Sequence, residues 1–504
     1  MPANIHMHKS YEQRQPEASL MHKILREHLS TFVEEMQNEG RSLPKYITKS
    51  FENYLKCGIP AHGVTRMTCA DCGSIFALPF SCKTRGICPS CHARRAAELA
   101  ATMVDELIPH NPVRQFVVNF PYPLRLWMAS NRNHLAKVCA IVCSIIQEFI
   151  LTRASHKPEQ ARDPNIKTGL LCFVQRFGSS LNLNPHFPII AMDGAFFCDE
   201  GYRPIFMQMP KLTDDNIALL TRNISETVNS YLIEEGLLTL EDGVVTLTNT
   251  EDIFEPDVDT EVHAPAMASS ISQTIAFGPR RGQPVQRLRP AVGNCESWSN
   301  RFQSEITSPL CARYDGYTVH ANRWIPQSDR KGLEKLISYA ARGPLSEERL
   351  RDLPNGNVEV KLKTPWTNGT THLIFTHSEF IEKLIALIPP SWFHMVRYFG
   401  MFVSNAKFRE TILPGFDGKK KMPKQPKKKR SIKWADLLKR VFDIDVTKCQ
   451  KCGGLLKLID ILMPSPELTQ LLRQLHLDPD PPPRLPAKTS HLFDAFFEDE
   501  VFCE

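Results

Sequence analysis

Two Cys-x-x-Cys pairs near the N-terminus are the residues best suited to hold a metal. Cys69 and Cys72 form the first pair, Cys88 and Cys91 the second, and fifteen residues separate them. Each pair makes a tight turn that presents two sulfurs to one ion, and four thiolates complete a tetrahedron. The spacing predicts a structural Zn²⁺ site made of these four cysteines.

Four further cysteines leave alternatives open. Cys57 and Cys82 flank the first pair and are either buried thiols or, with His62, ligands of a second ion. Cys449 and Cys452 form a third pair, followed by two glycines, without an obvious partner pair. They are either ordinary thiols or zinc ligands completed from elsewhere in the chain.

Basic residues surround the N-terminal cysteines. Arg94 and Arg95 follow the second pair directly, where a helix is expected to begin, and Lys83 and Arg85 precede it. Small zinc modules often lay such side chains on phosphates, although some serve protein contacts. We expect these four residues to contact DNA.

Charge and composition narrow the class of protein. Of 504 residues, 42% are hydrophobic and 23% charged, which is ordinary globular usage, and no apolar run is long enough for a membrane span. Eight bases lie in residues 419–430, and without them the remaining bases are fewer than the 55 acids. The net charge of +6 therefore comes from one run, which is either a polyanion-binding segment or a solvated linker. We expect a protein of the cell interior with no membrane partner.

Periodicity predicts the elements that must position these residues. Apolar spacing favours helices within residues 1–50 and at 98–107, 135–153 and 329–341. Strands are expected at 114–120, 171–177 and 185–192, the last two as an antiparallel hairpin. The predicted fold class is α+β: an N-terminal zinc-binding module, an antiparallel sheet with flanking helices, and a small C-terminal Cys-x-x-Cys module.

Several phrases in one order resemble a known family. They include FSCKTRGICPSCHARRAAE, NFPYPLRL, FVQRFGSSLNLNPHFPIIAMDGAF, ISYAARGPLSEERL, FHMVRYFGMFVSNAKFR and CQKCGG. Together they resemble the insertion-sequence transposases with an N-terminal zinc-binding domain, the IS-ninety-one-like rolling-circle group. The resemblance implies a helical region at 1–50, a zinc-binding domain at 51–108, a catalytic domain at 109–408, a basic linker at 409–434 and a C-terminal module at 435–504.

The resemblance also implies a chemistry. Such proteins are similar to single-strand endonucleases in which two histidines of a His-hydrophobe-His strand hold Mg²⁺ or Mn²⁺. A tyrosine on a nearby helix attacks the phosphate and leaves a 5′-phosphotyrosine. DNA, as single-stranded or hairpin element ends, is the implied partner, and the bacterial cytoplasm with its nucleoid the implied location.

The histidine pair is incomplete in this chain. Positions i and i+2 of a strand face the same side, so two histidines so spaced can share one ion. Here His186 is followed two residues later by Pro188. One imidazole is a poor divalent-ion site, and Gln175 or Asp193 would have to supply a further ligand.

A tyrosine in the expected position is present. On a helical wheel that starts at Leu333, the other apolar residues fall within about 60° of it, whereas Tyr339 lies at about 240°. Lys335 and Arg342 fall beside Tyr339, where they could lower its pKa and hold a phosphate. We expect Tyr339 to be the nucleophile.

Two functions follow. The first is a transposase that binds element ends and cleaves and rejoins single-stranded DNA through Tyr339; Pro188 leaves open whether the activity is retained or lost. The second is a zinc-module DNA-binding protein that descends from a transposase and does not cleave.

Overall fold

The computed structural model describes most of the chain. The described residues are 14–84, 86–155, 162–198, 204–241, 244–247, 259–288, 305–366, 368–390, 393–414, 436, 439–440 and 445–487. Arg85, the basic run at 419–430 and the acidic tail lie outside them.

The largest sheet is antiparallel and carries the predicted strands. Its order is β13-β14-β15-β3-β7-β5-β20, with β16 paired to β3 and β6 paired to β7. The strands are β3 (Val113–Asn119), β5 (Gly169–Phe173), β6 (Gln175–Phe177), β7 (Leu183–Met192), β13 (Glu305–Ser308), β14 (Cys311–Tyr314), β15 (Tyr317–His320), β16 (Trp324–Ile325) and β20 (Val396–Gly400). The predicted hairpin is present, because β7 pairs antiparallel with both β5 and β6.

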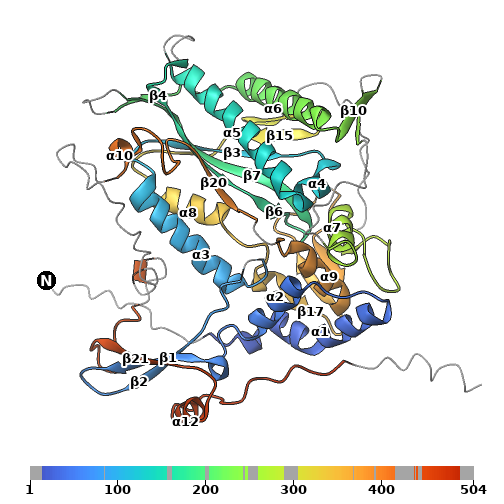
Figure 1. Ribbon diagram of the computed structural model, residues 1–504, viewed down its shortest axis with the longest axis vertical. Helices are drawn as coiled ribbons and strands as arrows, with labels where there is room; N and C mark the ends of the chain where they lie inside the picture. The colour runs from blue at the N-terminus through green and yellow to red at the C-terminus, as the bar shows by residue number, and fades with distance from the viewer. Residues whose placement is uncertain are drawn as a thin grey trace, which may run out of the picture.

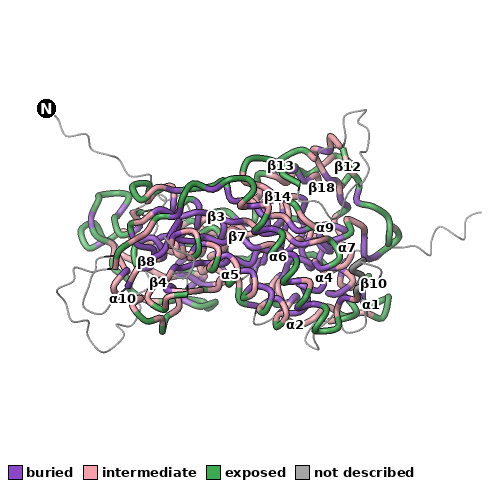
Figure 2. The backbone as a smooth tube through the Cα atoms, turned by 90° about the horizontal axis from the view of Figure 1, so that it is seen from above, coloured by how far each residue is buried: buried purple, intermediate pink, exposed green. Residues whose placement is uncertain are grey.

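Helices cover both faces of this sheet (Figure 1). One face is covered by α4 (Leu124–Ser130), α5 (Arg132–Ala154) and α6 (Asp214–Glu234); the other by α3 (Pro89–Thr102), its π-helical continuation η3 (Met103–Leu107), and α8 (Arg330–Ala340). The alternation of β7 feeds both cores: Phe187 and Ile189 pack with α5, whereas Ile190 and Met192 pack with α8. Figure 2 shows β3 and β7 buried between these layers. The predicted α+β class, with an antiparallel sheet and flanking helices, is confirmed.

Helix α5 is long and apolar enough to cross a membrane by length and composition. In the structure its buried side chains lie in the core of the sheet, together with those of β3 and β7. A core helix of a soluble protein passes the same test as a membrane span, so α5 alone is weak evidence for one.

The remaining elements form smaller units. Helices α1 (Leu20–Asn38), α2 (Lys45–Leu55), α7 (His263–Ser272) and α9 (His377–Leu387) share a core with the sheet β12 (Gln286–Leu288), β19 (His372–Phe375), β18 (Val358–Lys361) and β17 (Leu350–Asp352). Peripheral elements are η1 (Pro16–Ala18), β4 (Ile166–Lys167), β8 (Gly194–Phe197), β9 (Ile205–Gln208), β10 (Leu238–Glu241), β11 (Val244–Leu247), η5 (Glu347–Arg349) and α10 (Arg409–Ile412).

The C-terminal Cys-x-x-Cys segment does not form the separate module that the sequence predicts. Its strand β21 (Leu456–Leu462) pairs with β1 (Val64–Cys69), which also pairs with β2 (Ile75–Pro79). Helix α12 (Pro466–Gln474) packs against η2 (Pro60–His62) beside this sheet (Figure 1). The segment therefore completes the N-terminal zinc-binding domain, because the edge of β1 is free to accept a third strand.

Candidate functional site

Eight cysteines of the described residues gather in two groups of four, neither of them the predicted one, and a third group consists of Cys139, Cys143 and Cys172. Cluster 1 consists of Cys57, Cys82, Cys88 and Cys91, and cluster 2 consists of Cys69, Cys72, Cys449 and Cys452. The expected grouping of the first two Cys-x-x-Cys pairs is therefore wrong. The hairpin β1–β2 carries the first pair away from the start of α3, and β21 brings the third pair to it. His62 belongs to none of these groups.

Cluster 1 has the dimensions of a zinc site. The Sγ atoms of Cys57 lie 3.8 Å from Cys88 and 3.6 Å from Cys91, and Cys82 lies 3.4 Å from Cys91. A tetrahedron with Zn–S bonds of about 2.3 Å places its sulfurs about 3.8 Å apart. The residues present thus fit structural Zn²⁺.

Cluster 1 also joins the zinc-binding domain to the ends of α8 and α9. The backbone amide of Gly86 donates to His92 Nε2 at 2.7 Å, and a Cβ at Gly86 would lie 3.2 Å from Pro389, just beyond α9. A Cβ at Gly343, just beyond α8, would lie 2.7 Å from His92. The metal module therefore abuts the end of the helix that carries Tyr339.

The predicted DNA-contacting residues near cluster 1 are partly used in folding. Arg95 donates to the carbonyl oxygen of Lys83 at 2.7 Å, and Lys83 itself is exposed. Arg94 is half-buried, and burial lowers its pKa against the opposing effect of Glu98. Arg85 lies outside the described residues. Contact of these residues with DNA stays a prediction.

Helix α8 presents Tyr339 as the wheel predicts. The helix begins after Asp329, whose carboxylate accepts a hydrogen bond from the amide of Gly332. Its apolar stripe is buried and consists of Leu333, Leu336, Ile337 and Ala340. Tyr339 is 46% exposed.

Two cations hold the Tyr339 ring and hydroxyl. The Nζ of Lys363 donates to the phenol oxygen at 2.5 Å, and the guanidinium carbon of Arg342 lies 4.1 Å from the ring centroid. Burial alone would raise the pKa of Tyr339, but the hydrogen bond from Lys363 and the charges of both cations outweigh it and lower the pKa. Lys363 is a partner that the sequence analysis missed, because it comes from the loop after β18.

His186 lies on the face of β7 that looks toward α8. It is opposite Gln175 on β6 and Asn119 on β3, and its Nδ1 lies 2.8 Å from the carbonyl oxygen of Asn184. Burial, with smaller effects of Arg342 and Arg125, lowers its pKa to about 4. The imidazole is neutral at physiological pH.

The structure tolerates Pro188 at a break in the sheet. The strand beside β7 is interrupted between β5 and β6, opposite Phe187 and Pro188. Cys172 of β5 pairs with Ile189, and Gln175 of β6 pairs with His186, so the register is the same on both sides of this break. Proline has no amide hydrogen to donate there, so the neighbouring strand is divided in two. Pairing of Pro188 with Val117 on β3 keeps the other side intact.

The residues around His186 do not fit a divalent cation. Among the described residues, no group of three potential ligating side chains includes His186. The Gln175 amide donates to the carbonyl oxygens of Tyr339 and Ala340 at the end of α8, at 3.2 and 2.6 Å. Asp193 lies beyond the opposite end of β7 and is paired with Arg114 at 2.7 Å. The positive charges of Arg342 and Arg125 act on His186 instead, an environment that suits an anion rather than Mg²⁺ or Mn²⁺.

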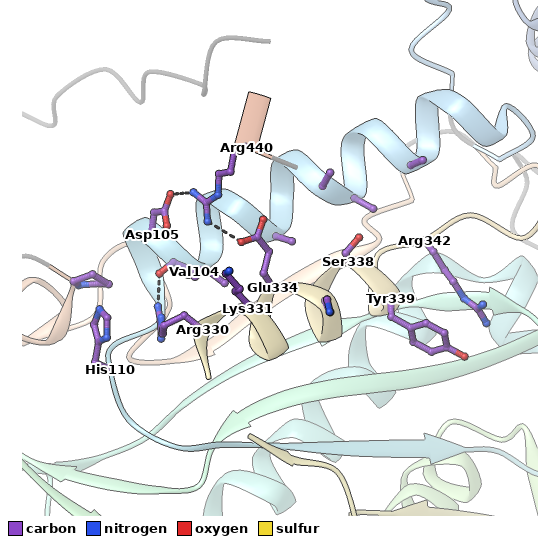
Figure 3. A pocket seen from close by; sticks show the side chains of 16 residues that line it. Val104, Asp105, His110, Arg330, Lys331, Glu334, Ser338, Tyr339, Arg342 and Arg440 are labelled. Atoms are coloured by element: carbon purple, nitrogen blue, oxygen red, sulfur yellow. Dashed lines mark hydrogen bonds and ion pairs between the residues drawn. The ribbon is translucent and has the colours of Figure 1, made fainter. Parts of the chain in front are cut away.

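A groove leads along α8 to Tyr339 (Figure 3). It has a volume of about 1140 Å³, with alanines of α3 on one side. The cationic residues that line it are Arg330, Lys331, Lys335, Arg342 and Arg440. Arg440 bridges Asp105 and Glu334 across the groove. Among the described residues that line the groove, these two are the only ones with a carboxylate. Lys335, predicted to lie beside Tyr339, is exposed in this groove, but the hydroxyl is bound by Lys363.

Because Asp193 serves the fold, breaking its pair should destabilise the protein. The Asp193 side chain is 2% exposed and also accepts from the Trp324 indole at 2.8 Å. Arg114→Met should lower the free energy of unfolding by about 3–5 kcal/mol, because it leaves a buried carboxylate unpaired. Chemical denaturation measures this.

The matched control is Arg222→Met, which removes an exposed pair with Glu226 of the same 2.7 Å length. It should change stability very little, because exposed ion pairs contribute weakly. Equal shifts for the two variants would contradict a structural role for the buried pair.

Two family models match the chain. The family described as "Putative transposase" (Y2_Tnp) matches residues 169–409, and the transposase zinc-binding domain family (Zn_Tnp_IS91) matches residues 24–120. No curated protein and no solved structure matches it. The zinc-binding domain, the antiparallel core and the exposed tyrosine are therefore parts of a transposase. The chain belongs to the IS91-like transposases with an N-terminal zinc-binding domain.

Proposed function

We propose that this transposase cleaves and rejoins single-stranded DNA at the ends of its element through a 5′-phosphotyrosine on Tyr339. The observation that carries the proposal is the exposed phenol, hydrogen-bonded by Lys363 and stacked against Arg342. The tyrosinate oxygen attacks the scissile phosphorus, the bond to the 3′-oxygen breaks, and that oxygen takes up a proton. Attack by a 3′-hydroxyl on the phosphotyrosine reverses the step and joins strands, as rolling-circle transposition requires.

Side-chain cations, rather than a metal ion, neutralise the phosphate in this proposal. Lys363 and Arg342 flank the nucleophile, and Arg125 and Arg349 carry further positive charge nearby. Within the described part of the chain none of these four forms an ion pair with a carboxylate. The Nε atom of Arg342 is buried without a hydrogen-bond partner, as expected of a group that awaits an anion. The Mg²⁺ or Mn²⁺ expected from the sequence has no place in this scheme.

The groove supplies a route for the strand. Its cations Lys331 and Lys335 suit phosphates, and its end at Tyr339 brings the backbone to the nucleophile. A flat alanine surface on α3 leaves room for an extended strand. The partner is DNA, as single-stranded or hairpin element ends, and the place of action is the bacterial cytoplasm at the nucleoid.

Pro188 supports a second function. A chain that lost the second metal histidine but kept its zinc-binding domain and cationic groove would bind element ends without cutting them. It would then act as a DNA-binding regulator or as the partner of an intact transposase.

An adduct assay separates these functions. Purified protein is mixed with oligonucleotides from the element ends, either without added divalent metal or with Mg²⁺ or Mn²⁺, and denaturation-resistant protein–DNA adducts are counted. We expect an adduct in both conditions that Tyr339→Phe abolishes. The control is Tyr398→Phe. The Tyr398 side chain is 41% exposed, similar to Tyr339, but partial burial of its phenol raises its pKa instead of lowering it.

The other outcomes are equally informative. An adduct that forms only with Mg²⁺ or Mn²⁺ would contradict our scheme and would favour a divalent ion at His186. An adduct from Pro188→His alone would assign the natural protein to the binding function. Salt-dependent binding without any adduct would do the same.

A further inference from the structure

Cluster 2 joins residues almost 400 positions apart in the sequence. Cys69 and Cys452 approach to 3.4 Å, and Cys72 and Cys449 to 3.6 Å, between their Sγ atoms. All four are free thiols. The transposase zinc-binding domain match ends at residue 120 and therefore does not include the second pair.

The two halves of cluster 2 have the same backbone geometry. In the first, the amide of Cys69 donates to the carbonyl of Ser74 at 2.9 Å and the amide of Gly73 to that of Cys69 at 3.0 Å. In the second, Cys449 donates to Gly454 at 2.7 Å and Gly453 to Cys449 at 2.8 Å. Gly73 and Gly453 both have positive φ, +70° and +77°. Two turns of the same shape thus face each other and present two sulfurs each.

The turns are also held in register against each other. The amide of Ala70 donates to the carbonyl of Leu455 at 3.0 Å, and Cys69 is paired with Leu456 in the sheet. A Cβ at Gly454 would lie 2.3 Å from a carboxylate oxygen of Asp71, so a larger residue there would displace the exposed Asp71 side chain. The four sulfurs, all within 4.8 Å of one another, match the edges of a tetrahedron around an ion with Zn–S bonds of about 2.3 Å.

The surrounding core is too small to hold this arrangement alone. It contains seven buried residues, from η2, β1, β21 and α12. Leu458, Ile461 and Met463 are each at least 60% exposed, so much of the apolar surface of β21 is not buried. Small units of this kind are commonly stabilised by a structural metal.

We propose that cluster 2 binds a zinc ion of its own and that this ion fastens residues 445–487 to the N-terminal zinc-binding domain. The ion is structural, since all four positions are filled by thiolates and none is open to substrate. The chain then carries two zinc ions, one in each cluster. The inference does not depend on the chemistry at Tyr339.

Metal analysis of the full-length protein tests this inference. The wild type should contain two zinc ions per chain, and Cys449→Ser combined with Cys452→Ser should contain one. Limited proteolysis should then release the C-terminal segment from the variant but not from the wild type. Cobalt-loaded wild type should show twice the thiolate-to-cobalt absorption of the variant.

Two matched variants guard against simple misfolding. Cys311→Ser, at a half-buried cysteine of β14 outside both clusters, should retain two ions and resist proteolysis. Cys452→His alone, which replaces the sulfur ligand with a nitrogen ligand, should retain the second ion. Two outcomes would overturn the inference. The first is two ions in the double serine variant; the second is a single ion in the wild type that the double serine variant still contains.

Discussion

Lys363→Met should slow adduct formation at neutral pH and shift its pH dependence to the alkaline side. The hydrogen bond from Lys363 lowers the pKa of Tyr339, whereas burial of the ring raises it. Without the lysine, burial and the remaining charge of Arg342 act alone, so the pKa rises. The reactive tyrosinate then becomes about tenfold rarer, at a given pH below the pKa, for each unit by which the pKa rises. The prediction rests on the proposed function.

Single-turnover rates between about pH 6 and pH 10 measure this effect. The rate of the variant should approach that of the wild type as the pH rises, because both phenols are then ionised. Arg342→Met should behave similarly but should also weaken DNA binding, since Arg342 lines the groove. Lys361→Met is the control: Lys361 is an exposed lysine two residues away, without contact to Tyr339 in the described structure. A uniform loss of rate at every pH would refute the role of Lys363 in setting the pKa.

Cys88→Ser should have the largest effect on stability. Cluster 1 lies inside the core shared by α1, α2 and α9, and Cys88 is the N-cap residue of α3. Structural zinc contributes about 10–16 kcal/mol of binding free energy in small domains, comparable to the whole stability of a typical protein. Losing one thiolate from cluster 1 should release its zinc and unfold the zinc-binding domain.

Zinc content and thermal unfolding measure the result together. Cys198→Ser is the matched control, since Cys198 is also fully buried but lies in neither cluster. It should keep its zinc and lose only about 1–3 kcal/mol, the cost of burying a hydroxyl. If Cys88→Ser unfolds no more easily than Cys198→Ser, cluster 1 is not a structural metal site.

The exposed position of Tyr339 on α8 was predictable because its signals are local. The helical wheel of α8 separates Leu333 and Ile337 from Tyr339, and the structure buries the first two and exposes the third. The strand pattern around His186 likewise predicts β7 and its hairpin partner. Lys363 was beyond reach, because its contact with Tyr339 depends on how the sheet of β18 packs, and no periodicity encodes that.

The cysteine pairing failed for a different reason. Spacing along the chain predicts that neighbouring Cys-x-x-Cys pairs share an ion, but sheet pairing decides which pairs meet. A signal was present: Cys69 to Gly73 and Cys449 to Gly453 follow the same Cys-x-x-Cys-Gly pattern. The six cysteines of the three Cys-x-x-Cys pairs, together with Cys57 and Cys82, make two complete sets of four.

The pairing of β1 with β21 orders events during synthesis. Val64 is opposite Leu462, so the ribosome must add almost 400 residues after β1 before its partner strand emerges. Until then β1 has only β2 beside it and an open edge. A copy of the gene interrupted by a stop codon before β21 would yield the tyrosine and its groove but never a closed zinc-binding domain. Completion of this domain thus requires that translation has passed β21.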